Sequence, residues 1–351
     1  MVQENNKVRF FEARKLFRTG WYMLIAVGLS FITLGTSALL AQTLEEAAKN
    51  EGKLMFYSSM VVPDTQAMGA AFMKKYPFIK FDFVRLGDTN LLQRLLSEKR
   101  SNKKIASVFF LQLYLANVYK SEGLMQKYIS PEARGLPEGF QDPEGYWTTV
   151  YSIYHTFVYN TRMVTEKEAP KRYEDLLDPR WKGKIGMSNN EYTWFKGMLD
   201  SMGREQGLQY MRRLAKQDII FRKGRTLTTQ LMVAGEFPIA KGVYNRVLSM
   251  QEEGAPIHWA SFPTPTMADM RAFVLHADAP QPNAGKLFID FMLSREGQGV
   301  LNKLDRHPVR RDIKVDSVID KVRNNLFPVK PASAEGTVAN IEEFKKVFQL
   351  R

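Results

Sequence analysis

Polar side chains stand where two predicted strands end in the first third of the chain. Ser58 and Ser59 close the strand-like run Lys53–Ser59, and Gln112 directly follows the apolar run Ala106–Leu111. In a mainly parallel α/β sheet, ligands bind beyond the carboxyl ends of the strands. We therefore expect these three side chains to contact a ligand. Helix capping is the alternative role for the two serines.

A second polar group precedes a predicted helix in the later half of the chain. Arg225 and Thr226 stand just before the predicted helix Leu227–Ala234, and Thr226 is the expected N-cap. Free backbone N–H groups, a hydroxyl and a guanidinium at one helix start can together bind an anionic group. The alternative is a solvated basic loop.

Asn190, Glu191 and Tyr192 form a similar group, because they follow the predicted strand Ile185–Met187 and open another helix. Glu191 would repel an anion and attract an amine, so a zwitterionic ligand is consistent with these residues. His155 is a further candidate ligand contact, although a lone histidine beside an apolar run is more often structural.

Composition narrows the possible chemistry. The chain has no Cys, and its four His, at positions 155, 258, 276 and 307, show no HxH or HExxH spacing. No nucleophile–base pair, phosphate loop or metal-ligand spacing is visible. We therefore predict a protein without catalytic residues, without a metal site and without a cofactor. An enzyme on the same fold is the alternative from another class.

Alternating strand and helix patterns must position these residues. Three strand–helix units follow residue 50 and predict a mainly parallel sheet with right-handed crossovers. In Phe157–Glu191, two short strands flank an aromatic turn, and a second α/β unit follows. We interpret this stretch as a crossing between two lobes, with Phe157–Thr161 as the first hinge strand and Met270–His276 as the return. Residues 328–337 are expected to be a surface connector.

The N-terminus has the pattern of a targeting segment. Five Lys or Arg and two Glu lie in the first 20 residues, and the nearly uncharged run Trp21–Ala41 follows. The pattern predicts a secretory signal over residues 1–41, with an uncleaved membrane anchor as the alternative. Without these five positive and two negative charges, the formal charge falls from +13 to +10. That balance favours anionic ligands or a diffusely charged surface over nucleic acid.

Four blocks of sequence resemble the bacterial extracellular solute-binding proteins related to ferric-iron-binding periplasmic proteins. They are LMFYSS at 54–59, VYNTRMV and YEDLLDPRWKGKIGM within 158–187, VAGEFPIA at 233–240, and APQPNAGKLFIDFMLSREGQ at 279–298. The resemblance implies an α/β, two-lobed type II periplasmic binding protein fold, in which each lobe is a mixed, mainly parallel sheet flanked by helices, with two hinge crossovers. It places residues 42–156 and 277–320 in the first lobe, and 157–276 and 321–351 in the second.

The same resemblance implies a function and a site. The protein would be the periplasmic solute-binding component of an ABC transporter, capturing a small polar, anionic or zwitterionic organic solute in the interlobe cleft by hinge closure. The expected partners are that solute and a cognate permease in the cytoplasmic membrane, with no nucleic acid, and the expected state is a monomer. The loop at Asn190–Tyr192 would face the cleft, and Tyr244 and Asn245 would occupy the ligand-bearing region.

The chain departs from the iron-binding members at each of their usual ligands. Those members typically use an adjacent Tyr pair, often with a His in the first loop and a Glu after the third strand. Here the first loop, Ser59–Val62, has no His, Gln112 stands in place of the Glu, and Tyr244 has no adjacent Tyr. A ferric iron or iron-chelate binding protein is therefore kept only as the alternative.

Overall fold

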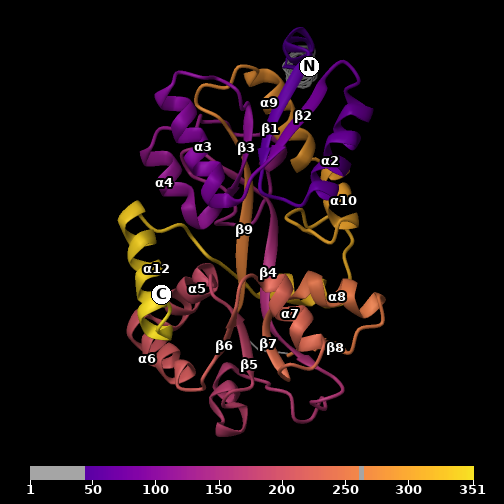
Figure 1. Cartoon of the computed structure of the whole chain (residues 1–351). Coiled ribbons are helices and arrows are strands. Elements are labelled where there is room, and N and C mark those ends of the chain that lie inside the picture. Colours follow the sequence, from indigo (N-terminus) through magenta and orange to yellow (C-terminus); the bar gives the residue numbers. More distant parts are fainter. Residues whose placement is uncertain (1–43, 261–264) are drawn as a thin grey trace, which may run out of the picture.

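Two lobes joined by long strands make up the molecule, as Figure 1 shows. The computed structural model describes residues 44–260 and 265–351, so the predicted targeting segment, residues 1–41, lies outside the described part. Residues 44–51 form a first helical segment. Over the described ranges, no helix combines the length and the apolar character needed to cross a membrane.

The N-terminal lobe is built from the first strands and helices together with a later pair of helices. Its elements are β1 (Lys53–Ser58), α2 (Val62–Lys75), β2 (Lys80–Arg85), α3 (Asp88–Arg100), β3 (Val108–Gln112), η1 (Leu113–Leu115), α4 (Ala116–Ser121), η2 (Pro131–Ala133), α9 (Pro282–Leu293), α10 (Arg295–Lys303) and β10 (His307–Pro308).

The C-terminal lobe holds the middle of the chain and its last helix. Its elements are η3 (Tyr173–Leu177), η4 (Pro179–Trp181), β5 (Ile185–Ser188), α5 (Tyr192–Met202), α6 (Arg204–Ala215), β6 (Ile220–Arg222), α7 (Arg225–Val233), β7 (Ile239–Val243), α8 (Tyr244–Glu252), β8 (Ile257–Trp259) and α12 (Ala334–Phe348). The connecting elements are β4 (Thr148–Asn160), β9 (Thr266–Leu275), α11 (Ser317–Val322), η5 (Arg323–Asn325) and β11 (Leu326–Pro328).

One continuous sheet runs through both lobes in the order β2-β1-β3-β9-β4-β7-β5-β6. In the N-terminal lobe β1 pairs in parallel with β2 and β3, and in the C-terminal lobe β5 pairs in parallel with β6 and β7. Between them β9 and β4 are antiparallel to each other and to their outer neighbours β3 and β7. The predicted α/β class, with mixed, mainly parallel sheets and two crossings, is confirmed.

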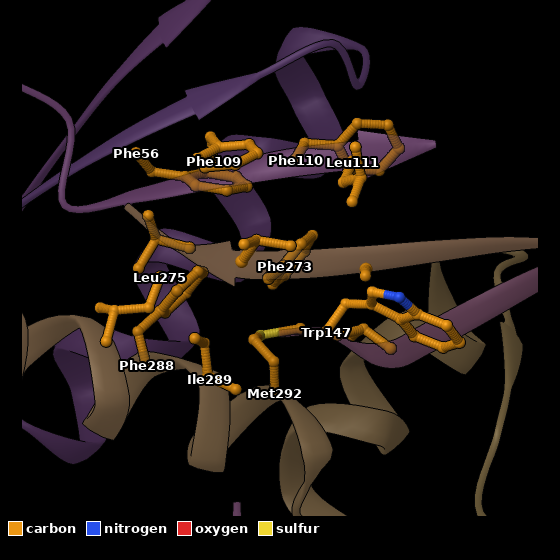
Figure 2. Packing of buried hydrophobic residues seen from close by; sticks show 14 of the residues in the cluster. Phe56, Phe109, Phe110, Leu111, Trp147, Phe273, Leu275, Phe288, Ile289 and Met292 are labelled. Carbon is orange, nitrogen blue, oxygen red and sulfur yellow. The ribbon is translucent and has the colours of Figure 1, made fainter. Parts of the chain in front are cut away.

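Each lobe has its own hydrophobic core. In the N-terminal lobe, Phe273 of β9 stacks on Phe288 of α9 with ring centroids 5.5 Å apart, and Phe56 of β1 packs edge-on against Phe273 (Figure 2). In the C-terminal lobe, Phe157 packs edge-on against Trp194. Helix α9 buries the apolar stripe that its sequence spacing predicts: Ala284, Leu287, Phe288, Phe291 and Met292.

The first crossing strand is much longer than the sequence predicted. The prediction began the hinge strand at Phe157, but β4 begins at Thr148 and includes Tyr151, which packs in the N-terminal core, as well as Phe157 in the other core. The physical reason is that TTVYSIYHTFVYN is rich in β-branched and aromatic residues and is almost entirely buried, so no turn interrupts the strand. The exact residue bounds of the two lobes stay a prediction.

The prediction of a surface connector over residues 328–337 holds for its middle, residues 330–333, and is wrong at both ends. Leu326–Pro328 forms β11, which pairs in parallel with β9, and Val329 is almost completely buried. Helix α12 then starts at Ala334, where Ser333 caps it by accepting a hydrogen bond from the backbone N–H of Gly336. The apolar Leu-Phe-Pro-Val run explains the difference, because these residues can bury against β9 at the lobe junction.

Candidate functional site

A polar cavity of about 450 Å³ lies between the lobes. In Figure 1, α2 and α10 lie in the upper lobe and α7 and α8 in the lower lobe. The N-terminal lobe contributes Val61, Asp64, Leu304, Asp305 and Arg306. The C-terminal lobe contributes Arg225, Thr226, Thr229, Val243, Asn245, Arg246 and Ser249, and Ile153 of the crossing strand β4 completes the wall. Because both lobes supply the wall, a bound molecule would contact both.

Three helices begin at this cavity. Val61 is the N-cap of α2, Arg225 and Thr226 open α7, and Val243 is the N-cap of α8. The three N-cap residues are Val61, Gly224 and Val243, and none of them accepts a hydrogen bond from the first turn through a side chain. The first N–H groups of a helix have no partner within the helix, and they carry partial positive charge. Uncapped helix starts at one cavity therefore favour an anionic group there.

The start of α7 differs from its prediction. Thr226 was expected to cap the helix, but the N-cap is Gly224 and the helix begins at Arg225. Gly224 has φ +90°, a conformation that glycine adopts readily and L side chains rarely do. Its backbone N–H donates to the Ser188 hydroxyl at 3.2 Å, which ties this turn to the end of β5. Thr226 is thus free to face the cavity.

A buried ion pair supports Arg225 from behind. The Arg225 Nε donates to Glu191 Oε1 at 2.6 Å, and a second guanidinium nitrogen lies 3.6 Å from Asp269 Oδ2. Arg271 also donates to Asp269 Oδ2, at 2.6 Å. Burial alone would raise the pKa of Glu191, but the charges of Arg225 and Lys241 outweigh it and hold that pKa at about 2. Glu191 is therefore a carboxylate that fixes the Arg225 side chain.

Lys241 of β7 completes this network. Its Nζ donates to the carbonyl of Gly242 at 2.9 Å, lies 2.8 Å from His155 Nδ1 and lies 3.7 Å from Glu191 Oε2. Burial lowers the pKa of Lys241 to about 7, although Glu191 opposes that shift. Burial, and then the charge of Lys241, lower the pKa of His155 well below its ordinary value. His155 is therefore neutral and accepts a hydrogen bond from the lysine ammonium.

The network contains more cations than anions. Lys241, Arg225 and Arg271 face two carboxylates, those of Glu191 and Asp269. When Lys241 is protonated, one positive charge is left uncompensated beside the cavity. The field of this buried group therefore adds to that of the helix starts and attracts anions.

On the opposite wall, Arg306 forms an ion pair with Asp64, with its Nε donating to Oδ2 at 3.0 Å. Asp64 is in the first turn of α2, a favourable place for a carboxylate. Arg246, in the first turn of α8, forms no ion pair within the part of the chain that the structure describes, and its Nε there has no hydrogen-bond acceptor. Arg246 is thus a cation available to a ligand.

Three of the eleven residues singled out from the sequence line the cavity: Arg225, Thr226 and Asn245. Glu191 and His155 lie in the buried network behind it, and neither lines the cavity wall. Their roles as ligand contacts stay a prediction, as do those of the other candidates.

The remaining candidates lie outside the wall in this conformation. Ser58 is fully buried, 3.3 Å from the Thr65 hydroxyl, and accepts from the backbone N–H of Met60, which precedes α2, so this bond does not cap the helix. Tyr244 is buried against Tyr154. Four further residues are absent from the wall: Ser59, Gln112, Asn190, which lies 2.6 Å from the Ser188 hydroxyl, and Tyr192, which packs edge-on against Phe344.

Sequence reasoning missed Lys241, Asp269 and Arg271. Each interrupts an apolar strand run, IAKGV in β7 or MADMRAF in β9, and each is at most 5% exposed. A charged residue inside a buried strand is rarely tolerated without a partner, so these interruptions were a usable signal. Arg246, Asp64, Asp305 and Arg306 gave no such signal, because only the packing of the two lobes brings them together.

Two lobes, strands that cross between them and a polar cavity at their junction define a two-lobed periplasmic binding protein. The family model described as "Bacterial extracellular solute-binding protein" matches residues 106–329, which is more than half of the chain, and the chain belongs to this family. Its members are the substrate-binding components of ABC transporters, and its relatives are periplasmic. The family and its neighbours are transport binding proteins.

Individual relatives differ in what they are named for. A Salmonella typhimurium protein named for binding 2-aminoethylphosphonate in the periplasm is 26% identical over 208 residues, or 55% of this chain and 59% of that protein. Iron-bound HitA from Pseudomonas aeruginosa has a TM-score of 0.71 at 18% identity, covering 83% of this chain and 99% of that one. AfuA from Actinobacillus pleuropneumoniae with fructose-6-phosphate has a TM-score of 0.67 at 22% identity, covering 85% and 97%. These two structures support the fold.

Proposed function

We propose that the interlobe cavity captures a small organic solute with an anionic group, and that the two lobes close around it for delivery to a membrane permease. The observation that carries this proposal is the convergence of the three uncapped helix starts of α2, α7 and α8 on one cavity. Backbone N–H groups at such starts bind phosphate, phosphonate or carboxylate oxygens.

Side chains around the cavity support the same assignment. Arg246 has a buried Nε without an acceptor among residues 44–260 and 265–351, and Arg225 is held at the wall by Glu191. Thr226, Thr229 and Ser249 add hydroxyl groups that can donate to oxygens of the solute. The relative named for 2-aminoethylphosphonate and the neighbour with bound fructose-6-phosphate are consistent with a phosphorus oxyanion as one form of this anion.

Closure of the two lobes around the solute is expected because both lobes supply groups that bind it. Helices α7 and α8 belong to one lobe, and α2 and the residues after α10 belong to the other. A solute that contacts both lobes stabilises the closed arrangement relative to the open one, and only that difference in free energy shifts the population. The permease could then distinguish loaded from empty protein.

Iron is an outcome that the test must address, because HitA is an iron-bound neighbour of the same fold. Within residues 44–260 and 265–351, no three His, Asp or Glu side chains are grouped so that they could hold a metal ion. Tyr244, which stands in the ligand-bearing region of the iron-binding members, is only 4% exposed. These observations favour an organic anion over a bare ferric ion.

A thermal-shift screen tests the proposal. The purified protein would be heated with phosphates, phosphonates, carboxylates, thiamine, polyamines and Fe(III)–citrate. A true solute at 100 times its Kd should add about 2.7 kcal/mol to the free energy of unfolding. Arg246→Gln should weaken that gain, whereas the exposed control Arg212→Gln on α6 should not. No gain with any anion would contradict the proposal, as would an iron-specific colour that Tyr244→Phe removes.

A further inference from the structure

Most charges around the interlobe cavity already have partners. Arg225 is paired with Glu191, and Arg306 with Asp64. These pairs are internal to one side of the cavity, so they shape the wall without joining the two lobes. The unpaired charges are therefore the ones that a ligand can bind without breaking an existing ion pair.

Two opposite charges on the cavity wall have no ion-pair partner in the described part of the chain, and they come from different lobes. Arg246 opens α8 in the C-terminal lobe, and Asp305 follows α10 in the N-terminal lobe. Neither forms an ion pair, with the other or with any group in the described ranges. The guanidinium of the neighbouring Arg306 binds Asp64 instead.

Buried polar atoms beside these charges also lack partners. The Arg246 Nε is a donor without an acceptor, and the Asn245 Oδ1 is an acceptor without a donor, among the residues that the structure describes. Asn245 is only 8% exposed. Buried polar atoms in native proteins are nearly always hydrogen-bonded. A ligand that supplies both an acceptor and a donor would satisfy this pair.

Negative charge gathers on one side of the cavity. A smaller hollow of about 180 Å³ adjoins it, sharing Asn245, Asp305 and Arg306, and adds the acidic side chains Glu252 and Asp316. Although Asp305 keeps access to solvent, partial burial raises its pKa, and the charge of Glu252 raises it further. A cation placed here would relieve that repulsion. Positive potential at the starts of α7 and α8 is thus matched by negative potential at Asp305.

We infer that the solute is a zwitterion, with its anionic group on Arg246 and the starts of α7 and α8, and with an ammonium group on the Asp305 carboxylate and the Asn245 oxygen. Asp305 is then the residue that determines specificity for the ammonium. This inference rests on the proposed function and narrows its substrate class. The anionic end of such a solute binds the C-terminal lobe, and its ammonium end adds the contact to Asp305 of the N-terminal lobe, so the solute bridges the two lobes and favours closure.

Matched pairs of probes test this directly by calorimetry on the intact protein. Each pair differs only in the ammonium group: 2-aminoethylphosphonate and ethylphosphonate, phosphoethanolamine and ethyl phosphate, β-alanine and propionate, taurine and ethanesulfonate. In at least one pair, the zwitterion should bind about 10-fold or more tightly than its partner. Asp305→Asn should remove that difference without weakening the affinity for the ammonium-free partner.

Asp218→Asn is a matched control. Asp218 has φ +52° and Asp305 has φ +56°, so both substitutions place Asn, which tolerates this conformation, at the same backbone geometry. Asp218 lies in the turn between α6 and β6, away from the cavity wall, and should leave binding unchanged.

The outcomes separate the inference from the proposed function. Equal affinities within every pair that binds, or an equal loss for both members in Asp305→Asn, would overturn the zwitterion while leaving anion binding intact. Binding of anions from the wider screen without any zwitterion would do the same. Absence of binding by every anion would instead contradict the proposed function itself. The comparison on the unsubstituted protein decides the question even if the variant does not fold.

Discussion

Lys241 Nζ lies 2.8 Å from His155 Nδ1 in the buried network behind the cavity, and these two side chains are 0% and 1% exposed. The ammonium can only donate, so the imidazole accepts through Nδ1 and carries its proton on Nε2. That Nε2 faces Asp269 Oδ2 at 3.6 Å. The contact joins β7 of the C-terminal lobe to the crossing strands β4 and β9, and its charge state depends on pH.

The stability of the protein should rise with pH above neutrality because of Lys241. Its pKa is about 7 when folded and about 10.5 when unfolded, so between these values the unfolded chain binds the extra proton. The contribution of this one group to the free energy of unfolding then increases by up to about 1.4 kcal/mol per pH unit above pH 7, and it is constant below pH 7. Urea unfolding from pH 6 to 9 would measure it.

The control for this prediction is Lys241→Met, which removes the titrating group while keeping a long apolar side chain. The rise between pH 7 and 9 should be absent from the variant. If the variant and the unsubstituted protein show the same pH dependence, Lys241 does not titrate in this range.

Glu191→Gln should destabilise the protein and weaken anion binding together. The substitution leaves Arg225 buried against a neutral amide, and loss of one member of a buried ion pair typically costs 3–5 kcal/mol. Glu342→Gln is the control, because the Glu342–Lys345 pair is exposed and should change stability by less than about 1 kcal/mol. Denaturant unfolding and calorimetry would measure both effects. A Glu191→Gln variant as stable as the control would show that this pair does not anchor Arg225.

The sequence was sufficient for the architecture because its signals are local. Apolar runs predicted β1, β3 and β5 within one or two residues, and the spacing of Leu287, Phe288 and Phe291 predicted the buried face of α9. The length of β4 and the existence of β11 were not predictable in this way. Both depend on pairing with β9, a strand more than 50 residues away from each of them.

The candidate site was only partly predictable for the same reason. Arg225 and Asn245 stand at helix starts, and helix starts have a sequence pattern. Asp305 and Arg246 are unremarkable in sequence, and their opposition across the cavity exists only because α10 and α8 pack at the same lobe junction. Lys241 was overlooked because a strand pattern predicts burial and not the partners that make a buried charge tolerable.

Gly297→Ala should destabilise the N-terminal lobe. A Cβ at Gly297 would lie 2.1 Å from the Phe291 carbonyl oxygen and 2.7 Å from the Met292 Cα, and such backbone atoms cannot simply rotate away. We expect a loss of about 1–3 kcal/mol or more. Gly299→Ala, on the same helix α10, has no atom within 4 Å of its added Cβ and should be neutral or stabilising by up to about 1 kcal/mol. Equal stabilities of the two variants by thermal unfolding would contradict this packing.

Asn117→Ala should loosen the two lobes, because the segment before α12 links them. Asn117 Nδ2 of the N-terminal lobe donates to the Ala332 carbonyl at 2.7 Å, while Phe344 of α12 packs in the other core. Losing that hydrogen bond costs about 0.5–1.5 kcal/mol and removes a restraint on hinge motion. Since the chain has no Cys, spin labels at introduced cysteines on α2 and α6 can report the interlobe distance. The distribution of interlobe distances should broaden in Asn117→Ala and not in the exposed control Asn90→Ala. An unchanged width in both variants would mean that this segment does not restrain the hinge.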